Sequence, residues 1–252
     1  MRASLALVCL AACAPIPHMT VPQSSGVAIG TIVLPLSNVH VVLGRYPMLV
    51  DTGAPGDIVE LRHGLRQLGV RLEDVRCAVV THGHSDHAGG ARVLQRLGIK
   101  IVAGTGDLWR ELRGVHGHLT STGGLFALFL KLLVPGHYQP FWPDVRVRDR
   151  YDLRPLCGVD GEVIAMPGHT AGSVVVLLAG GKVAMVGDLF RGGALAGYVH
   201  PSEPKEHFFQ DDLALVHRQI HALLARGVEV FVLGHGGPSR RDDVIRVFGL
   251  KD

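Results

Sequence analysis

The residues with the clearest chemical potential lie in the run THGHSDHAGG at positions 81–90, which holds three histidines and one aspartate within six consecutive positions. His82, His84 and His87 each offer a neutral imidazole nitrogen, and Asp86 offers a carboxylate oxygen. Borderline-soft divalent ions such as zinc favour this mixture of ligands. The run therefore predicts a metal site.

The segments on either side suggest how these four side chains are presented. Residues 76–80, RCAVV, are β-prone and predict a strand that delivers the cluster to a sheet edge. In an extended segment His82 and His84 point the same way, so that they can bind one ion together. Asp86 and His87 follow at the turn into an amphipathic helix and can bind a second ion. A polar, histidine-rich loop is the alternative interpretation of this run taken alone.

Three later turns each place one more candidate ligand directly after an apolar strand. His169 follows EVIAMPG, Asp188 follows VAMVG and His235 follows VFVLG. Side chains at strand ends converge on one edge of a sheet structure, and sites are usually built on loops that a rigid scaffold holds. This recurrence predicts that the three residues join the histidine cluster.

The remaining sequence predicts alternating strands and helices, which imply an α/β layer structure. Three short strands at 27–34, 38–43 and 46–50 favour an antiparallel meander. Helical spacing and turn residues place the other elements. We expect strands at 76–80, 99–103, 162–166, 172–178, 182–186 and 228–233, and helices at 57–68, 88–97, 107–113, 205–226 and 242–248.

Length and composition are those of a globular protein. The 252 residues are 47% apolar and only 19% charged, which describes one compact domain. The net charge of +3 gives no case for nucleic-acid or membrane binding by bulk electrostatics. The 15 histidines are many for this length and fit a metal protein.

The first residues resemble a bacterial lipoprotein signal. Arg2 precedes an apolar run, residues 5–12, that is too short to span a bilayer as a mature helix. Leu10-Ala11-Ala12-Cys13 resembles a lipoprotein box, in which cleavage precedes a cysteine that becomes lipid-modified. We therefore expect a signal peptide at 1–12, a tether at 13–26, and a domain at 27–252 that the Cys13 lipid holds to a membrane of the bacterial cell envelope. Without the lipid the protein would be secreted or periplasmic. The alternative to a signal peptide is a misplaced start codon or a buried apolar strand.

Two further features lie inside the predicted domain. Cys77 and Cys157 are expected to be core residues rather than a disulfide. Residues 115–149 form an insert that contains GGLFALFLKLLV at 123–134, with Lys131 as its single charge. This stretch predicts either a buried helix or a lid or interfacial helix that lines a pocket for an apolar substrate or meets the membrane.

As a set, the motifs resemble those of the metallo-β-lactamase-fold hydrolase superfamily. The chain has HGHSDH at 82–87, PGHTAGS at 167–173, GD at 187–188 and GHG at 234–236, so the resemblance spans residues 27–248. It implies an αββα sandwich of two mixed sheets flanked by helices. It also implies a dinuclear centre with two zinc ions, for which iron or manganese are alternatives.

The resemblance also assigns roles to the candidate ligands. By the family's pattern one ion is held by His82, His84 and His169, and the other by Asp86, His87 and His235. Asp188 bridges the two ions. Asp51, in the stretch LVDTG, matches a position that supports the ligands from behind.

Departures from known branches narrow the activity. The aspartate at position 188 argues against a dedicated β-lactamase. Flavodiiron proteins carry a glutamate where this chain has His84, which argues against that oxygen-reducing branch. Lactonases of the superfamily usually have a tyrosine shortly after the bridging aspartate, where this chain has Arg191, with Tyr198 farther on. The turn GDLF at 187–190 resembles glyoxalase II, but no recognisable basic glutathione-binding segment follows at the C-terminus.

These features predict a hydrolase that acts on a small molecule, with an apolar substrate as one option and no nucleic-acid partner. Two ions about 3.5–4 Å apart can hold a bridging hydroxide at neutral pH, which would cleave an ester, thioester, lactone or phosphodiester. Asp86 can orient the attacking water, and Arg191, Tyr198 and His200 are candidates for substrate contacts. The alternatives are a mononuclear iron persulfide dioxygenase, a β-lactamase, and a lipoprotein that keeps metal only for structure.

Overall fold

The computed structural model describes residues 16–21, 26–123, 127, 131–194, 197 and 199–249. The predicted signal peptide, Cys13 and Tyr198 lie outside the described residues, as do half of the tether (13–15 and 22–25) and six positions of the apolar stretch, 124–126 and 128–130.

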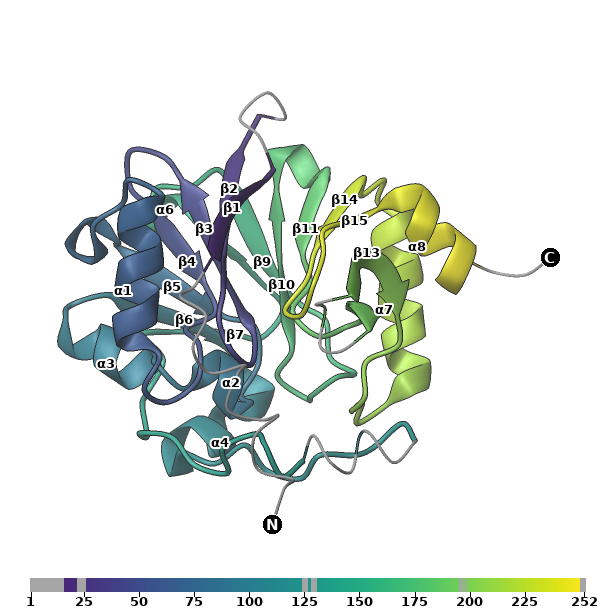
Figure 1. Cartoon of the computed structure of the whole chain (residues 1–252), viewed down its shortest axis with the longest axis horizontal. Coiled ribbons are helices and arrows are strands. Elements are labelled where there is room, and N and C mark those ends of the chain that lie inside the picture. Colours follow the sequence, from purple (N-terminus) through teal and green to yellow (C-terminus); the bar gives the residue numbers. More distant parts are fainter. Residues whose placement is uncertain are drawn as a thin grey trace, which may run out of the picture.

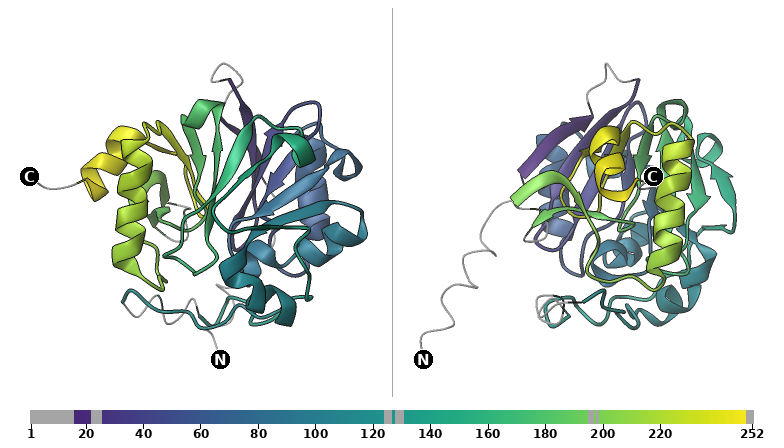
Figure 2. Two further views of the ribbon diagram at one scale, coloured as in Figure 1. Left: turned by 180° about the vertical axis from the view of Figure 1, so that it is seen from behind. Right: turned by 90° about the vertical axis from the view of Figure 1, so that its right-hand side faces the viewer.

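Two mixed sheets pack face to face, and helices cover both outer faces (Figure 1). The first sheet has seven strands in the order β1-β2-β3-β4-β5-β6-β7, and the second has six in the order β15-β14-β11-β10-β9-β8. Helices α1 and α3 lie against the first sheet, while α7 and α8 lie against the second, as the rotated views in Figure 2 also show. The predicted αββα sandwich is confirmed.

The first half of the chain builds the first sheet. An antiparallel meander comes first, as predicted, and three parallel strands extend it. Its strands are β1 (Ile16–Val21), β2 (Ala28–Val33), β3 (Asn38–Leu43), β4 (Met48–Val50), β5 (Cys77–Val80), β6 (Lys100–Gly104) and β7 (Val145–Val147). Its helices are α1 (Ile58–Gln67), α2 (Ser85–Ala88), α3 (Ala91–Arg96) and α4 (Leu108–Arg113), with short 3₁₀ turns at Leu72–Asp74 and Thr105–Asp107.

The second half builds the other sheet, in which β9, β11 and β14 run in the same direction and end at the same edge. Its strands are β8 (Arg150–Asp152), β9 (Gly161–Ala165), β10 (Val174–Leu178), β11 (Val183–Met185), β14 (Val230–Val232) and β15 (Ser239–Arg240). A separate hairpin pairs β12 (Arg191–Ala194) with β13 (Val199–Lys205). The helices are α6 (Arg154–Cys157), α7 (Leu213–Ala225) and α8 (Arg241–Phe248), with a 3₁₀ turn at Ala179–Gly181.

Apolar side chains fill three layers, and strand β5 shows how one strand serves two of them. Ala78 and Val80 pack into the layer under α1 and α3, whereas Cys77 and Val79 pack into the layer between the sheets. Side chains alternate across a strand, so a strand that is buried on both faces must be apolar throughout. Each fully buried valine stabilises the fold by roughly 1.5–3 kcal/mol. The rigid strands then fix where their terminal turns lie.

Two of the differences from the sequence-based expectation have a clear physical reason. Residues Ile16–Val21, within the predicted tether, form β1 and cover the edge of β2 that would otherwise expose unpaired backbone groups. The helix predicted at 205–226 begins only at Leu213, because Asp212 caps it by accepting a hydrogen bond from the Leu215 amide at 2.8 Å. The residues before Asp212 belong to β13 and a loop.

The apolar stretch at 123–134 is only partly described. Ala127 is buried in a small cluster with Leu119 and Phe209, but Leu132 is 81% exposed. The described end of the stretch is therefore not part of a buried helix. No helix among the described residues has the length and apolarity needed to cross a membrane.

The expectation for the two inner cysteines was wrong. Cys77 at the start of β5 and Cys157 at the end of α6 are both fully buried and form a disulfide across 80 residues of sequence. The pairing depends on which side chains face each other between the sheets, and spacing along the chain does not reveal this. The bond joins the two halves of the sandwich covalently.

We predict that replacing both cysteines, Cys77→Ser with Cys157→Ser, lowers the free energy of unfolding by about 2–4 kcal/mol, because the unfolded chain gains the freedom that the cross-link removes. Urea unfolding of both proteins measures this difference. Free thiols counted in denaturant provide the control, since the wild type and the double variant should give equal counts. Two additional thiols in the wild type would contradict the disulfide.

Candidate metal centre

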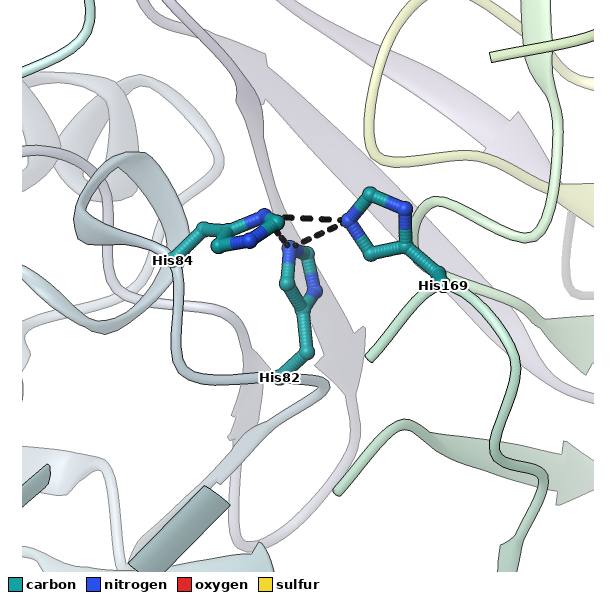
Figure 3. A group of neighbouring side chains, drawn as sticks. All are labelled: His82, His84 and His169. Carbon is teal, nitrogen blue, oxygen red and sulfur yellow. Dashed lines mark hydrogen bonds between the residues drawn. The ribbon is translucent and has the colours of Figure 1, made fainter. Parts of the chain in front are cut away.

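Three histidines from two different turns converge at the shared edge of the sheets (Figure 3). His82 and His84 follow β5, and His169 follows β9. The His82 Nε2, His84 Nδ1 and His169 Nε2 atoms form a triangle with sides of 3.0–3.1 Å. A tetrahedral zinc with Zn–N distances of about 2.05 Å places its ligand nitrogens roughly 3.3 Å apart, so the triangle has the size of a zinc site.

The protonation of these rings favours a bound cation. Burial lowers the pKa values of His82 and His84 well below the usual histidine value, and burial also lowers that of His169. The rings are therefore neutral. His169 donates its Nδ1 proton to the Phe209 carbonyl at 2.9 Å, which leaves the Nε2 lone pair directed at the other two rings. A cation at the centre of the triangle would be bound by the lone pairs of these three nitrogens.

A second donor group lies next to the first and consists of Asp86, His87 and His235. Asp86 Oδ2 is 3.5 Å from His87 Nε2 and 3.6 Å from His235 Nε2. His87 Nε2 is buried without a hydrogen-bond partner among the described residues. Burial opposes protonation of His87, but the carboxylates of Asp188, Asp86 and Asp51 outweigh it and raise its pKa well above the usual value. The local field therefore favours positive charge.

Asp188 lies between the two groups. Its Oδ2 is 3.8 Å from His82 Nε2 on one side, and 3.3 Å from His87 Nε2 and 3.2 Å from His235 Nε2 on the other. Burial alone would raise the pKa of Asp188, but the surrounding imidazoles hold it well below its usual range. Its Oδ1 is buried and has no partner among the described residues. The seven residues predicted as ligands thus lie together, in groups that could hold divalent metal.

Asp51 lies behind the candidate ligands and contacts His87 and Thr81, the residue before His82. Its Oδ2 accepts a hydrogen bond from His87 Nδ1 at 2.8 Å, and its Oδ1 accepts one from the Thr81 amide at 2.8 Å. The residue is fully buried and has a φ of 67°, an uncommon value for a residue other than glycine. This backbone conformation directs the carboxylate to the metal-binding run, so local strain serves the geometry of the site.

Asp107 braces the three-histidine group, a role that the sequence analysis did not assign. Its Oδ2 accepts from the Gly83 amide at 2.8 Å and from the Thr170 hydroxyl at 2.5 Å, so it contacts both turns that carry His82, His84 and His169. Arg110, which is 4% exposed, donates to the other oxygen and offsets the buried charge. Nothing in the spacing of these residues points to this contact.

Asn38 and His40 of β3 hold the turn that carries His235. The Asn38 amide donates to the Gly234 carbonyl at 2.8 Å, and its side chain donates to the Gly236 carbonyl at 2.9 Å. His40 Nε2 donates to the Leu233 carbonyl at 2.9 Å. The first sheet therefore positions a ligand of the second.

His207 is a further histidine at the centre that sequence reasoning missed. The helix predicted at 205–226 would have included it, but it lies in the loop before α7. It is 6% exposed, and its Nε2 is 3.3 Å from Asp188 Oδ2. Its ring centroid is 4.9 Å from that of His169, and burial lowers its pKa to about 3.

The candidate substrate contacts are less clearly placed. Arg191 begins β12, donates to the Gly193 carbonyl and stacks over the Phe208 ring at 4.0 Å. His200 is exposed on β13 and has a φ of 51°. The roles of Arg191, His200 and Tyr198 in substrate binding stay predictions.

The sandwich and the edge cluster define a class: an α/β protein with a histidine- and aspartate-rich metal-binding site at the shared ends of two sheets. The sequence matches the family description "Metallo-beta-lactamase superfamily" over residues 34–235. The chain belongs to the metallo-β-lactamase superfamily.

Similar proteins agree with this assignment. Metallo-beta-lactamase domain-containing protein 1 of Xenopus laevis is 30% identical over 208 residues, which are 81% of this chain and 72% of that protein. The hydroxyacylglutathione hydrolase GloC of Haemophilus influenzae is 28% identical over 147 residues, 58% of this chain and 62% of that protein. A metallo-β-lactamase of Cronobacter sakazakii superposes with a TM-score of 0.61 at 21% identity, covering 88% of this chain and 78% of that one, and shows the shared fold.

One buried carboxyl group beneath the centre has no described partner. Glu111 of α4 is fully buried, and neither of its carboxyl oxygens has a hydrogen-bond partner among the described residues. Burial, reinforced by the nearby Asp107 carboxylate, raises the pKa of Glu111 to about 8. The folded protein therefore holds a proton that an unfolded glutamate releases at much lower pH.

We predict that Glu111 makes the fold less stable as pH rises. The pKa of Glu111 is about 8 in the folded protein and 4.5 in the unfolded chain. Its contribution to the free energy of unfolding is therefore complete below pH 4.5 and is lost as pH rises through 8. Glu111→Gln removes this titration. The free energy of unfolding of the variant, relative to that of the wild type, should therefore rise by up to about 1 kcal/mol per pH unit between about pH 5 and 7.5.

Urea unfolding across this pH range measures the difference, with the exposed Glu73→Gln as the matched control. The candidate ligand histidines are present in both proteins, so their effect on the free energy of unfolding cancels in the difference. Parallel stability curves for the wild type and Glu111→Gln would contradict the prediction.

Proposed function

We propose that the protein is a dinuclear metal-dependent hydrolase that cleaves an ester, thioester, lactone or phosphodiester bond of a small molecule. The observation that carries this proposal is the shared carboxylate: Asp188 Oδ2 lies within 3.8 Å of His82 Nε2 in one group and within 3.3 Å of His87 and His235 Nε2 in the other. Zinc is the ion that the neutral imidazoles and carboxylates suit best.

A bound pair of such ions supplies an activated water and polarises the substrate oxygen. The chain's own residues then have distinct tasks. The three-histidine group and the group of Asp86, His87 and His235 supply the ligand atoms. Hydrogen bonds to Asp51 and Asp107 fix the orientation of the residues that carry those atoms. The side chain of Asp86 is 9% exposed, and its carboxylate can accept a proton from the attacking water.

The relatives guide the choice of substrate to test first. The Haemophilus influenzae relative is a hydroxyacylglutathione hydrolase, an enzyme that acts on a thioester, and it covers 58% of this chain. A thioester is therefore the first substrate class for this protein. Asp188 weighs against dedicated β-lactamase activity, since the family's β-lactamases generally lack a bridging aspartate.

We predict that zinc-loaded protein binds about two equivalents of metal and hydrolyses one class in a panel of thioester, lactone, phosphodiester and β-lactam substrates. His84→Ala should lower both metal content and kcat/KM, the latter by at least about 100-fold, because one corner of the nitrogen triangle is lost. His217→Ala, which changes a partly exposed histidine of α7, is the matched control. Less than one equivalent of transition metal, or full activity of His84→Ala, would refute the proposal.

We also propose that the protein is exported to the bacterial cell envelope and anchored there by a lipid on Cys13. The buried Cys77–Cys157 disulfide supports export, because disulfides form and persist in oxidising compartments. The lipid supplies the membrane attachment, with the catalytic domain outside the bilayer.

In a bacterial host, wild-type protein should enter the detergent phase of a Triton X-114 separation, and Cys13→Ser should enter the aqueous phase because the acyl chains are absent. Cys9→Ser, which changes a cysteine outside the cleavage site, serves as the control and should behave like the wild type. Equal partitioning of the wild type and Cys13→Ser would rule out the anchor.

A further inference from the structure

Large apolar side chains are exposed at the ligand edge, the end of the sandwich at which the turns with the candidate ligands lie. Trp109 and Leu112 of α4 are 45% and 43% exposed, and Leu132 and Leu133 of the apolar stretch are 81% and 37% exposed. We call these four side chains the apolar rim. Exposed apolar side chains that gather in one region mark an interaction surface, whereas scattered single ones do not.

Contacts with the metal-binding run fix the apolar rim at this edge. Helix α4 begins directly after Asp107, whose carboxylate accepts from the Gly83 amide at 2.8 Å. The Ser85 hydroxyl donates to the carbonyl of Pro135, two residues beyond the rim. Because Gly83 and Ser85 flank the candidate ligand His84, both pieces of the rim are attached to the same run. Figure 1 shows α4 and the segment after it at the same end as α2.

The apolar stretch is also attached to the loop before α7. The Thr122 amide donates to the Phe208 carbonyl at 2.9 Å. The carbonyl of the next residue, Phe209, accepts a hydrogen bond from the candidate ligand His169 at 2.9 Å. The apolar stretch therefore begins and ends beside turns that hold candidate ligands.

The first strand begins at the same edge. Ile16, the first residue of β1, pairs with Val33 at the end of β2. The turn after Val33 contacts the metal-binding run, because the Ser37 hydroxyl donates to the Asp86 carbonyl at 2.5 Å. Strand β1 therefore starts at the ligand edge and runs away from it.

The distance along the chain from Cys13 to β1 is short. Cys13 precedes Ile16 by three residues, which span at most about 11 Å. Strand β1 has six residues and is about 20 Å long, so the opposite end of the first sheet lies beyond that reach. A lipid on Cys13 would therefore hold the ligand edge, rather than the opposite end, next to the membrane.

We propose that the apolar rim lies in the interface of the membrane to which Cys13 anchors the protein, so that the ligand edge faces the lipid surface. This orientation rests on the proposed lipid anchor. Tryptophan and leucine side chains insert at the level of the lipid headgroups, and neighbouring basic side chains bind anionic headgroups. Arg113 at the end of α4 and Lys131 before Leu132 supply such charges beside the rim.

The two tryptophans of the chain provide the first test. Trp109 follows β6, whereas Trp142 precedes the parallel strand β7 and so lies toward the other end of these strands; it is 49% exposed. Trp142→Phe leaves Trp109 as the single fluorophore, and Trp109→Phe leaves Trp142. In acylated protein on vesicles of brominated phosphatidylcholine, Trp109 should lose about half of its emission relative to unbrominated vesicles, and Trp142 less than about a tenth.

The outcomes separate the orientation from the anchor. If the protein stays with the vesicles while Trp109 is unquenched, or while Trp142 is quenched as strongly, the orientation is wrong and the anchor stands. If the acylated protein does not stay with the vesicles, the anchor is refuted and the orientation with it.

The second test changes the rim and leaves Cys13 in place. Leu132→Asp should lower the quenching of Trp109 by at least about half, because a carboxylate in the interface opposes insertion. Val59→Asp changes a 70% exposed position on α1 and is the matched control, which should keep the wild-type quenching. Equal quenching of Trp109 in both variants would contradict the rim as the membrane contact.

Sedimentation of the Cys13→Ser protein tests the other occupant of the rim, a second copy of this chain. We expect a monomer. A dimer that Leu132→Asp dissociates and Val59→Asp does not would place the second copy on the rim and overturn the proposal.

Discussion

A single carboxylate oxygen sets the constraint on this protein. Asp188 Oδ2 lies in the interior with five imidazole Nε2 atoms, those of His82, His87, His169, His207 and His235, at 3.2–3.8 Å. An isolated buried carboxylate is very costly, and so are several imidazoles with nitrogens directed at one another. The arrangement becomes favourable when cations take up both sets of lone pairs. The fold must therefore hold many polar groups together in the interior, where each of them needs a charged or hydrogen-bonded partner.

This need for restraint explains why supporting contacts come from both halves of the chain. Asn38 of β3 binds the turn of His235, Asp107 before α4 binds the turn of His169, and the Thr81 carbonyl accepts from the Val174 amide at 2.8 Å. Each contact joins one sheet to a ligand turn of the other. The Cys77–Cys157 disulfide adds a covalent link between the same two halves. The two sheets are thus coupled near the centre as well as through their shared apolar layer.

The sequence predicted which candidate ligands lie together better than it predicted the residues that hold them in place. Ligands follow apolar strands in a repeated pattern, and that pattern is local, so His169, Asp188 and His235 can be found without coordinates. Asp107 cannot be found this way, because its partners Gly83 and Thr170 are distant in sequence and are brought close only by the sandwich. The α/β layer structure followed from alternating strands and helices, and the αββα sandwich followed from the family resemblance. The disulfide depended on which β5 side chains face inward.

His207 shows the limit of such reasoning most clearly. Apolar spacing after residue 205 suggested a helix through it, but Asp212 supplies a cap that starts α7 later and leaves His207 in a loop. Even with the position known, residue type does not separate a ligand from a donor, because a neutral imidazole contains both functions. The partner of the second ring nitrogen makes that distinction where there is one such partner: a carboxylate for His87 and a carbonyl for His169. His207 Nδ1 has both the carbonyl and the amide of Phe209 within 3.1–3.2 Å, so its contacts fit either role.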